Sequence, residues 1–162
     1  DPIPGIEFLQ SEDSLYIDKA IRGIAQHTQS RPDWIIATIM IESGFNPHAT
    51  NDSTSAYGLI QFMPGTLASM GITKHEIESA GIQQMEYVSQ YFLQIAKIFG
   101  KLDTPTKTYL AVFYPVAIDK GPDYRIGGPV TYRQNRGLDM NHDGILTRLD
   151  ITHKIENVLS NL

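Results

Sequence analysis

Apolar side chains recur at helical spacing along most of the chain. In the clearest helix, about residues 83–99, they alternate in steps of three and four: Met85, Val88, Phe92, Ile95 and Phe99. Similar spacing, with proline in a first turn or glycine after a last one, predicts helices at about 14–29, 32–43, 64–70, 74–80, 105–117 and 148–160. Strand signals are weak throughout, so the sequence predicts a mainly α fold.

Two stretches lack this period. Residues 1–13 carry Pro2, Pro4 and Gly5 and are predicted to form an extended lead-in. Residues 119–138 are broken up by prolines and glycines and are predicted to form a loop, which at that length is usually functional or flexible. The total of 162 residues suits one domain, residues 1–162.

Composition narrows the function classes. A hydrophobic content of 41% allows a sizeable core, and the absence of cysteine excludes disulfides, a thiol nucleophile and thiolate metal ligands. The net charge of −5 disfavours nucleic acid as a partner. No apolar run reaches membrane-spanning length. The start, "DPIPGIEF", has no initiator Met or signal peptide, which suggests a processed product or part of a larger polypeptide.

A carboxylate follows the most apolar helix. Residues 34–41, "WIIATIMI", place apolar groups in nearly every direction around the helix axis, so this helix should be buried on most sides. Glu42 continues the row made by Ile35 and Ile39 and lies in the last turn, at the negative end of the helix dipole. Burial and the dipole both raise the pKa of such a carboxyl, which favours a role as general acid. The alternative is an ordinary exposed glutamate.

Two blocks carry a family resemblance. Residues 42–47, "ESGFNP", and 56–64, "AYGLIQFMP", followed by Thr66, resemble the lytic transglycosylase family with the goose-lysozyme-like fold. That family's pattern is E-S-x-[FWY]-x-P-x-A, a short polar loop, and then G-L-x-Q-x-M-P-x-T. The resemblance covers about residues 20–118. It implies a lysozyme-like (SLT-type) helical domain and Glu42 as the sole catalytic acid/base.

The resemblance also implies the surroundings of a glycan cleft. Ser43 would support the helix end, Gln61 and Met63 would line the cleft, and Tyr57 and Phe62 would flank it; a place in the core is the alternative for Phe62 and Met63. The polar loop is about one residue longer than the family's, so its sugar-contacting serine has several candidates: Asn51, Asp52, Ser53 and Ser55. Gly58 is expected at a close backbone approach.

A third family block, A-Y-N-x-G, appears here in the altered form "AVFYP" at residues 111–115. Phe113 and Tyr114 are the candidates for the tyrosine role, while the asparagine is missing. This change affects the expected saccharide contacts on that side of the cleft and leaves the acid in place.

The reaction implied by the resemblance is cleavage of the β-1,4 bond between N-acetylmuramic acid and N-acetylglucosamine in peptidoglycan, with a 1,6-anhydro product. Glu42 would act first as acid and then as base. A second carboxylate, Asp52, leaves open a hydrolytic muramidase, because ordinary glycosidases use two carboxylates. A non-catalytic glycan-binding module is the other alternative.

Residues 139–150, "DMNHDGILTRLD", match the calcium-loop template D-x-[DN]-x-[DN]-G. Oxygen ligands for Ca²⁺ are expected from six positions: Asp139, Asn141, Asp143, Ile145 (its carbonyl), Thr147 and Asp150. Gly144 would supply the sharp turn and Leu146 an apolar anchor. Asp in the last position, where Glu is usual, makes bidentate contact harder and lets Mg²⁺ compete. The alternative is an Asx-rich turn without an ion. The predicted role is structural: an EF-hand-like loop that ties residues 119–138 to the last helix.

Location follows from the substrate. Peptidoglycan lies outside the bacterial cytoplasm, so the expected place of action is the periplasm, the wall or a phage virion. The altered third block and the calcium loop are similar to those of phage-borne or secretion-associated relatives.

Overall fold

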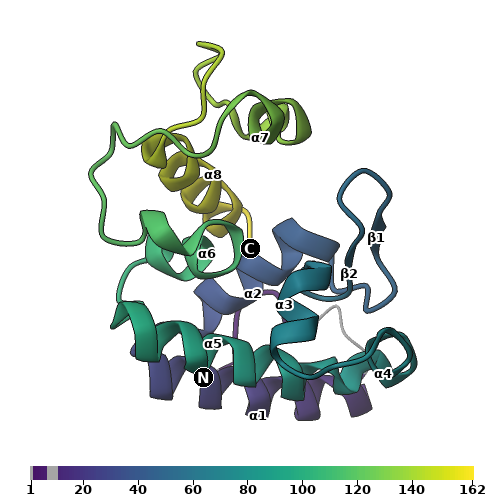
Figure 1. The fold of residues 1–162 in the computed structure, drawn as a ribbon. Coiled ribbons are helices and arrows are strands. Elements are labelled where there is room, and N and C mark those ends of the chain that lie inside the picture. The colour runs from purple at the N-terminus through teal and green to yellow at the C-terminus, as the bar shows by residue number, and fades with distance from the viewer. Residues whose placement is uncertain (1, 7–10) are drawn as a thin grey trace.

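The computed structural model describes residues 2–6 and 11–162 (Figure 1). It confirms the mainly helical prediction. The α-helices are α1 (Ser11–Thr28), α2 (Pro32–Ser43), α3 (Pro64–Ser69), α4 (Lys74–Ala80), α5 (Met85–Phe99), α6 (Pro105–Phe113), α7 (Pro129–Gln134) and α8 (Arg148–Ser160). Short 3₁₀ turns cover Gly81–Gln84, Pro115–Ala117 and Arg136–Leu138, and the strands β1 (Thr50–Asn51) and β2 (Ala56–Tyr57) form a small hairpin.

Helix ends follow the local signals in the sequence. Proline occupies the first turn of α2, α3, α6 and α7, where its missing N–H costs nothing. Gly44 ends α2 in the left-handed conformation, φ 60°, and its N–H bonds to the Met40 carbonyl. Thr73 begins α4 with a capping box that Glu76 completes. These signals explain why the predicted bounds of α2 and α4 agree with the structure.

The core forms where α2 meets its neighbours. α1 and α5 pack side by side along the base of the view in Figure 1, and α2 packs against α1, α6 and α8. The predicted inner face of α1, with Ile17, Ile21 and Ile24, is buried. In α2 the run 35–39 is buried without a break, as expected for a helix covered on most sides. None of the helices in residues 2–6 and 11–162 is long and apolar enough to cross a lipid bilayer.

Three predictions about the secondary structure were wrong, and two of them concern helix boundaries. Helix α1 begins at Ser11, so the end of the supposed lead-in is helical; residues 7–10 of that segment lie outside the described residues. Helix α6 ends at Phe113, and the chain continues as a 3₁₀ turn from Pro115. Proline disfavours helical backbone at the residue before it, which accounts for the break at Tyr114.

The third error concerns residues 119–138, which were predicted to be a loop. The segment contains α7 and the 3₁₀ turn Arg136–Leu138. Helix α7 has only six residues and buries none of them, so it shows no apolar period that a sequence pattern could reveal.

Candidate active site

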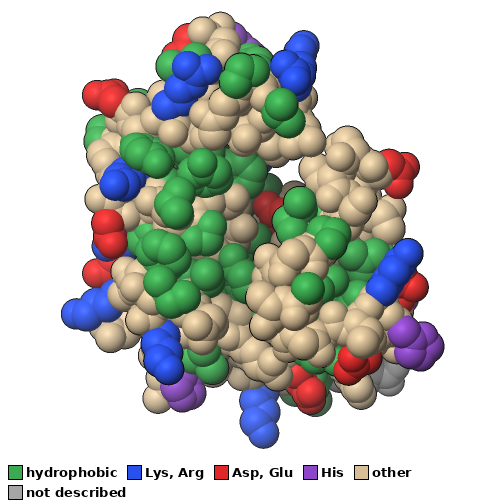
Figure 2. Space-filling view, viewed as in Figure 1, with side chains coloured by type: hydrophobic (Ala, Val, Ile, Leu, Met, Phe, Trp, Pro, Cys, Tyr) green, Lys and Arg blue, Asp and Glu red, His purple; other side chains and the backbone are tan. Residues whose placement is uncertain are grey.

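A cleft of about 570 Å³ lies between the hairpin and helices α6, α7 and α8. Figure 2 shows it as a hollow with an acidic group at its base. Its lining comes from helices α2, α6, α7 and α8 and from the hairpin: Ile41, Glu42, Asn51, Thr54, Ala56, Gln61, Met63, Tyr109, Val112, Phe113, Tyr114, Thr131, Gln134, Asn135, Gly137, Leu138 and Lys154. Within the described part of the chain, Glu42 is the only acidic residue that lines this cleft.

Glu42 lies in the last turn of α2 and is only partly exposed. Burial raises the pKa of its carboxyl from 4.5 to about 7, while a hydrogen bond with the Tyr109 side chain lowers it. A large fraction of this group is therefore protonated near neutral pH. The pKa suits a group that must both give and accept a proton.

Two tyrosines near Glu42, Tyr91 and Tyr109, were not predicted from the sequence. Burial raises the pKa of Tyr91 to about 12 and holds that of Tyr109 well above 10, and the negative charge of Glu42 adds to both effects. Both phenols therefore stay protonated at any pH at which the protein would work. The Tyr91 hydroxyl donates to the Ala111 carbonyl, which leaves Tyr109 as the phenol that bonds to the acid.

Tyr109 also packs against the altered third block. Its ring stacks on Phe113, with ring centroids 5.7 Å apart and planes 22° from parallel. The two residues are one turn apart on α6, so they share a face of the helix. Because of this i, i+4 spacing, Tyr109 could have been named beside Phe113 and Tyr114 as a candidate for the tyrosine role.

A second group of residues holds the chain beside Glu42. The Ser43 hydroxyl donates to the Leu59 carbonyl at 2.6 Å, which joins the end of α2 to the loop after the hairpin. The Gln61 amide donates to the carbonyls of Ala49 and Gly58, at 3.0 Å each. Gln61 itself has φ 56°, a left-handed conformation that its hydrogen bonds help to maintain.

Gln84 is fully buried beneath the same loop and was also missed. Its side-chain carbonyl accepts the Leu59 N–H at 2.9 Å, and its amide donates to the carbonyls of Pro47 (2.7 Å) and Ile77 (3.0 Å). Gly58 has φ 89°, and a Cβ there would come within 2.4 Å of Gln84 Oε1. The predicted close approach at Gly58 is therefore confirmed, with Gln84 as its partner. A lone glutamine carries no sequence signal for such a role.

The other predicted substrate-binding residues are distributed over three places. Gln61, Phe113, Tyr114 and the 46% exposed Met63 line the cleft with Glu42. Phe62 is buried in the core. The remaining three, Ser53, Ser55 and Tyr57, do not belong to the cleft lining among the residues described.

The hairpin explains that division. β1 and β2 pair antiparallel, with Thr50 opposite Tyr57 and Asn51 opposite Ala56. Ser55 and Tyr57 line a second groove on the other side of the hairpin, together with Asp52. Ser53 instead donates its N–H and its hydroxyl to the Asn51 side chain. Of the four candidates for the sugar contact, Asn51 is the one that reaches the cleft.

The far wall of the cleft comes from the segment that was expected to be a loop. Thr131, Gln134 and Asn135 belong to α7 or follow it directly, and Lys154 adds a cation from α8. These residues add amide, hydroxyl and ammonium groups to the lining of the cleft that contains Glu42, which suits a polyhydroxylated ligand. No motif in the sequence pointed to them.

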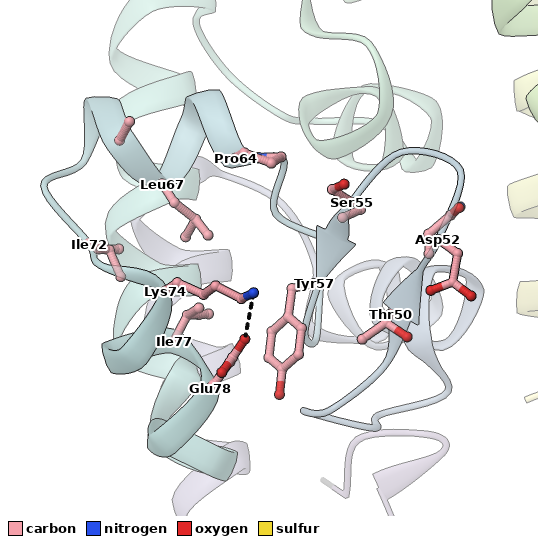
Figure 3. A pocket seen from close by; sticks show the side chains of 13 residues that line it. Thr50, Asp52, Ser55, Tyr57, Pro64, Leu67, Ile72, Lys74, Ile77 and Glu78 are labelled. Atoms are coloured by element: carbon pink, nitrogen blue, oxygen red, sulfur yellow. Dashed lines mark ion pairs between the residues drawn. The ribbon is translucent and has the colours of Figure 1, made fainter.

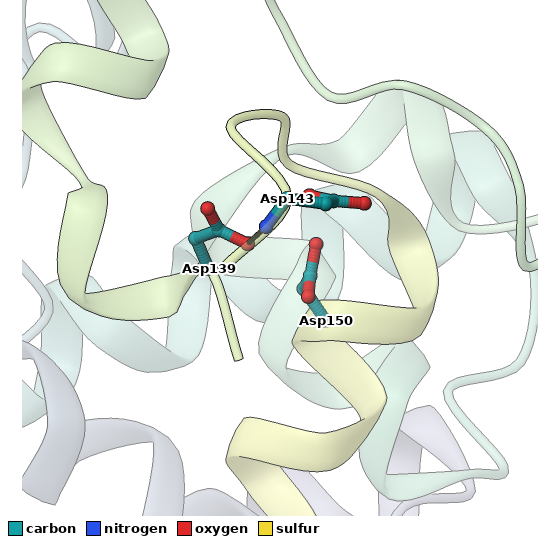
Figure 4. A group of neighbouring side chains, drawn as sticks. All are labelled: Asp139, Asp143 and Asp150. Carbon is teal, nitrogen blue, oxygen red and sulfur yellow. Dashed lines mark hydrogen bonds between the residues drawn. The ribbon is translucent and has the colours of Figure 1, made fainter. Parts of the chain in front are cut away.

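The acidic loop 139–150 follows α7 and the 3₁₀ turn Arg136–Leu138, and its last residues form the first turn of α8. Asp139, Asp143 and Asp150 each place one carboxylate oxygen within 4.8 Å of the corresponding oxygens of the other two (Figure 4). Asp139 and Asp150 are buried, and Asp143 is exposed. Gly144 has φ 85° and Leu146 is buried, as their predicted places in the loop require.

The Tyr132 hydroxyl and backbone N–H groups hold the carboxylates of Asp139 and Asp150 in place. Asp139 accepts hydrogen bonds from Tyr132 and Gly144, and Asp150 accepts them from Met140 and Thr147. The atoms that these three residues offer to a metal ion are all carboxylate oxygens, and they come from both ends of the loop. Such a set of ligands fits a hard cation such as Ca²⁺.

Comparison with known protein families gives a match. The family model described as Transglycosylase SLT domain matches residues 19–99, half of the chain, from α1 through α5. No curated protein and no solved structure matches the chain. The matched region contains Glu42, the hairpin and Gln84. The chain therefore belongs to the transglycosylase SLT domain family, whose members act on peptidoglycan.

Proposed function

We propose that the protein is a lytic transglycosylase that cleaves the β-1,4 bond between N-acetylmuramic acid and N-acetylglucosamine and forms 1,6-anhydro-N-acetylmuramic acid. The observation that carries the proposal is Glu42: among the described residues it is the one carboxyl that lines the cleft, and its pKa is raised to about 7. One such group is sufficient for a reaction that consumes no water.

The reaction proceeds in two proton transfers. Protonated Glu42 donates to the glycosidic oxygen as the C1–O bond breaks, and positive charge develops at C1, where the substrate's own acetamido group can stabilise it. The Glu42 carboxylate then takes the proton of the muramyl C6 hydroxyl, whose oxygen bonds to C1. Glu42 ends the cycle protonated, as it began.

Tyr109 assists the first transfer as a positioning residue. Its hydrogen bond stabilises the carboxylate form of Glu42, the form that is produced when Glu42 donates its proton to the glycosidic oxygen. Because its own pKa is well above 10, Tyr109 keeps donating throughout the cycle. Burial and this hydrogen bond thus oppose each other and leave the pKa of Glu42 near the middle of the range that acid/base catalysis needs.

The hydrolytic alternative has less support. A hydrolase would need a second carboxylate to activate water or to act as nucleophile. Among the described residues, Asp52 lines the second groove and is not part of the cleft that holds Glu42. The position of Asp52 favours the transglycosylase over the muramidase.

Product mass tests the proposal. The purified protein is incubated with sacculi, and the released fragments are analysed by mass spectrometry. We expect fragments that end in anhydro-muramic acid, one water lighter than hydrolysed ones. Fragments of the hydrolysed mass would favour a muramidase, and no fragments would favour a glycan-binding module. Because peptidoglycan is extracytoplasmic, the protein would act in the periplasm, in the wall or from a virion.

We further propose that residues 139–150 bind Ca²⁺ in a structural role. The loop is tied to the segment before α7, since Ile126 N–H bonds to the Leu146 carbonyl and Arg148 N–H to the Tyr124 carbonyl. Tyr132 of α7 bonds to Asp139. An ion bound by the three aspartates would therefore also stabilise the wall of the cleft that α7 forms.

Calcium removal should lower the melting temperature. At a free Ca²⁺ concentration of about 100 Kd, binding adds about 2.7 kcal/mol, which corresponds to about 5–10 °C for a chain of this size. We expect EDTA to remove this increment, and Asp143→Ala to make the melting curve insensitive to Ca²⁺. Asp123→Ala, an exposed aspartate outside the loop, is the control. Identical wild-type curves with Ca²⁺ and EDTA would contradict the site.

A further inference from the structure

A second groove, of about 510 Å³, lies on the side of the hairpin that faces α3 and α4 (Figure 3). Asn51 and Ala56 line both this groove and the cleft that contains Glu42. The two-stranded hairpin therefore lies between the two spaces, and a ligand in one can continue into the other around the hairpin.

The groove combines an apolar base with charges of both signs. Leu67, Ile72 and Ile77 supply apolar side chains from α3, α4 and the turn between them. Lys74 and Glu78 form an ion pair across one turn of α4, with 3.8 Å between Nζ and Oε1, and their side chains are 88% and 42% exposed. A long, exposed pair of this kind contributes little to stability, so both charges are available to a ligand.

The hairpin side of the groove adds an aromatic ring and a carboxylate. Figure 3 shows the Tyr57 ring beside the Lys74–Glu78 ion pair, while Asp52 lies farther out on the hairpin. The Tyr57 hydroxyl bonds to His48 Nδ1 at 2.9 Å, which fixes the ring. The groove therefore offers one cation, two anions, an aromatic face and an apolar base within one elongated space.

We propose that this groove binds the stem peptide of the peptidoglycan strand whose sugars occupy the cleft. This inference rests on the proposed function, because the stem peptide is attached to the muramyl residue beside the bond that is cleaved. A stem peptide carries carboxylates, which Lys74 can pair with, and an amine on its diamino acid, which Glu78 and Asp52 can pair with. Its alanine methyl groups match the apolar base.

The dimensions agree with this path. Paired strands lie about 4.8 Å apart, and an extended chain advances about 3.3–3.6 Å per residue. A stem of four residues extends up to about 13–14 Å, enough to pass the hairpin and enter the groove. A bare glycan has no such side branch, so the groove would distinguish peptide-bearing strands from denuded ones.

The test compares two substrates. One is intact sacculi, and the other is the same glycan freed of peptides by an amidase. We expect Lys74→Ala, and separately Ala68→Phe, which fills the groove without changing its charge, to lower kcat/KM on intact sacculi about 5- to 10-fold. On the denuded glycan both variants should match the wild type. Lys97→Ala, an exposed lysine on α5 outside both spaces, is the control.

Equal losses on both substrates would mean that the groove binds glycan and would overturn the proposal, as would no loss on either.

A direct measurement separates this proposal from the proposed function. The tetrapeptide L-Ala-γ-D-Glu-L-Lys-D-Ala is titrated into the wild-type protein and followed by amide chemical shifts. We expect shifts at residues 67–78 that Lys74→Ala weakens. Absence of these shifts rejects the groove even if the enzyme is active, whereas failure to cleave either glycan rejects only the proposed function.

Discussion

Replacement of Glu42 by Gln is expected to lower fragment release from sacculi about 10²- to 10⁴-fold, the range that a positioned general acid/base contributes. Gln is nearly isosteric but cannot give or take a proton at this site. Release is measured as soluble muropeptide per unit time, with Glu156→Gln, an exposed glutamate of α8, as the control. Equal activity of wild type and Glu42→Gln would remove Glu42 from the mechanism.

The same variant should change how stability depends on pH. Because the folded-state pKa of Glu42 is raised above 4.5, the unfolded chain loses this proton at lower pH than the folded protein does. Wild-type stability should therefore decline as pH rises from about 4.5 through about 7. Glu42→Gln should lack this decline and be the more stable protein at pH 8. This result would also show that lost activity does not come from unfolding.

Replacement of Gln84 by Ala is expected to lower the free energy of unfolding by about 3–5 kcal/mol. The change leaves the N–H of Leu59 and the carbonyls of Pro47 and Ile77 without their partner, at about 1–3 kcal/mol for each buried group. It also leaves a cavity beneath the loop that carries Gln61. We therefore expect activity to fall as well, even at temperatures where the variant is folded.

Chemical denaturation measures this effect, and the neighbouring residue supplies the control. Gln83 lies in the same 3₁₀ turn and is exposed, so Gln83→Ala should cost less than about 0.5 kcal/mol. If Gln84→Ala and Gln83→Ala were equally stable, the three hydrogen bonds would not be holding the loop.

The helices were predictable where local signals and burial agree. Pro32 and Gly44 mark both ends of α2, and its mostly apolar run 34–41 predicts the burial that the structure shows for residues 35–39. The segment 119–138 shows the opposite case. Helix α7 has proline in its first turn but no buried residue, so its position depends on contacts such as that of Tyr132 with Asp139.

The candidate site divides in the same way. The raised pKa of Glu42 could be predicted because the carboxyl follows a run of apolar residues on a helix that is buried on most sides. Tyr109 and Gln84 could not, because they reach the site from other helices and are distant in sequence. Ser53 and Ser55 lie outside the cleft lining, which the sequence could not reveal because it does not show which side of the hairpin each residue takes.

Titration of Glu42 in the folded protein tests the central claim most directly. The side-chain carboxyl carbon can be followed by ¹³C NMR from pH 3 to 9, with Glu42→Gln used to assign its resonance. We predict a midpoint of about 7, caused by burial and limited by the hydrogen bond from Tyr109. A midpoint near 4.5, the value of an ordinary glutamate, would contradict a single carboxyl that serves as both acid and base.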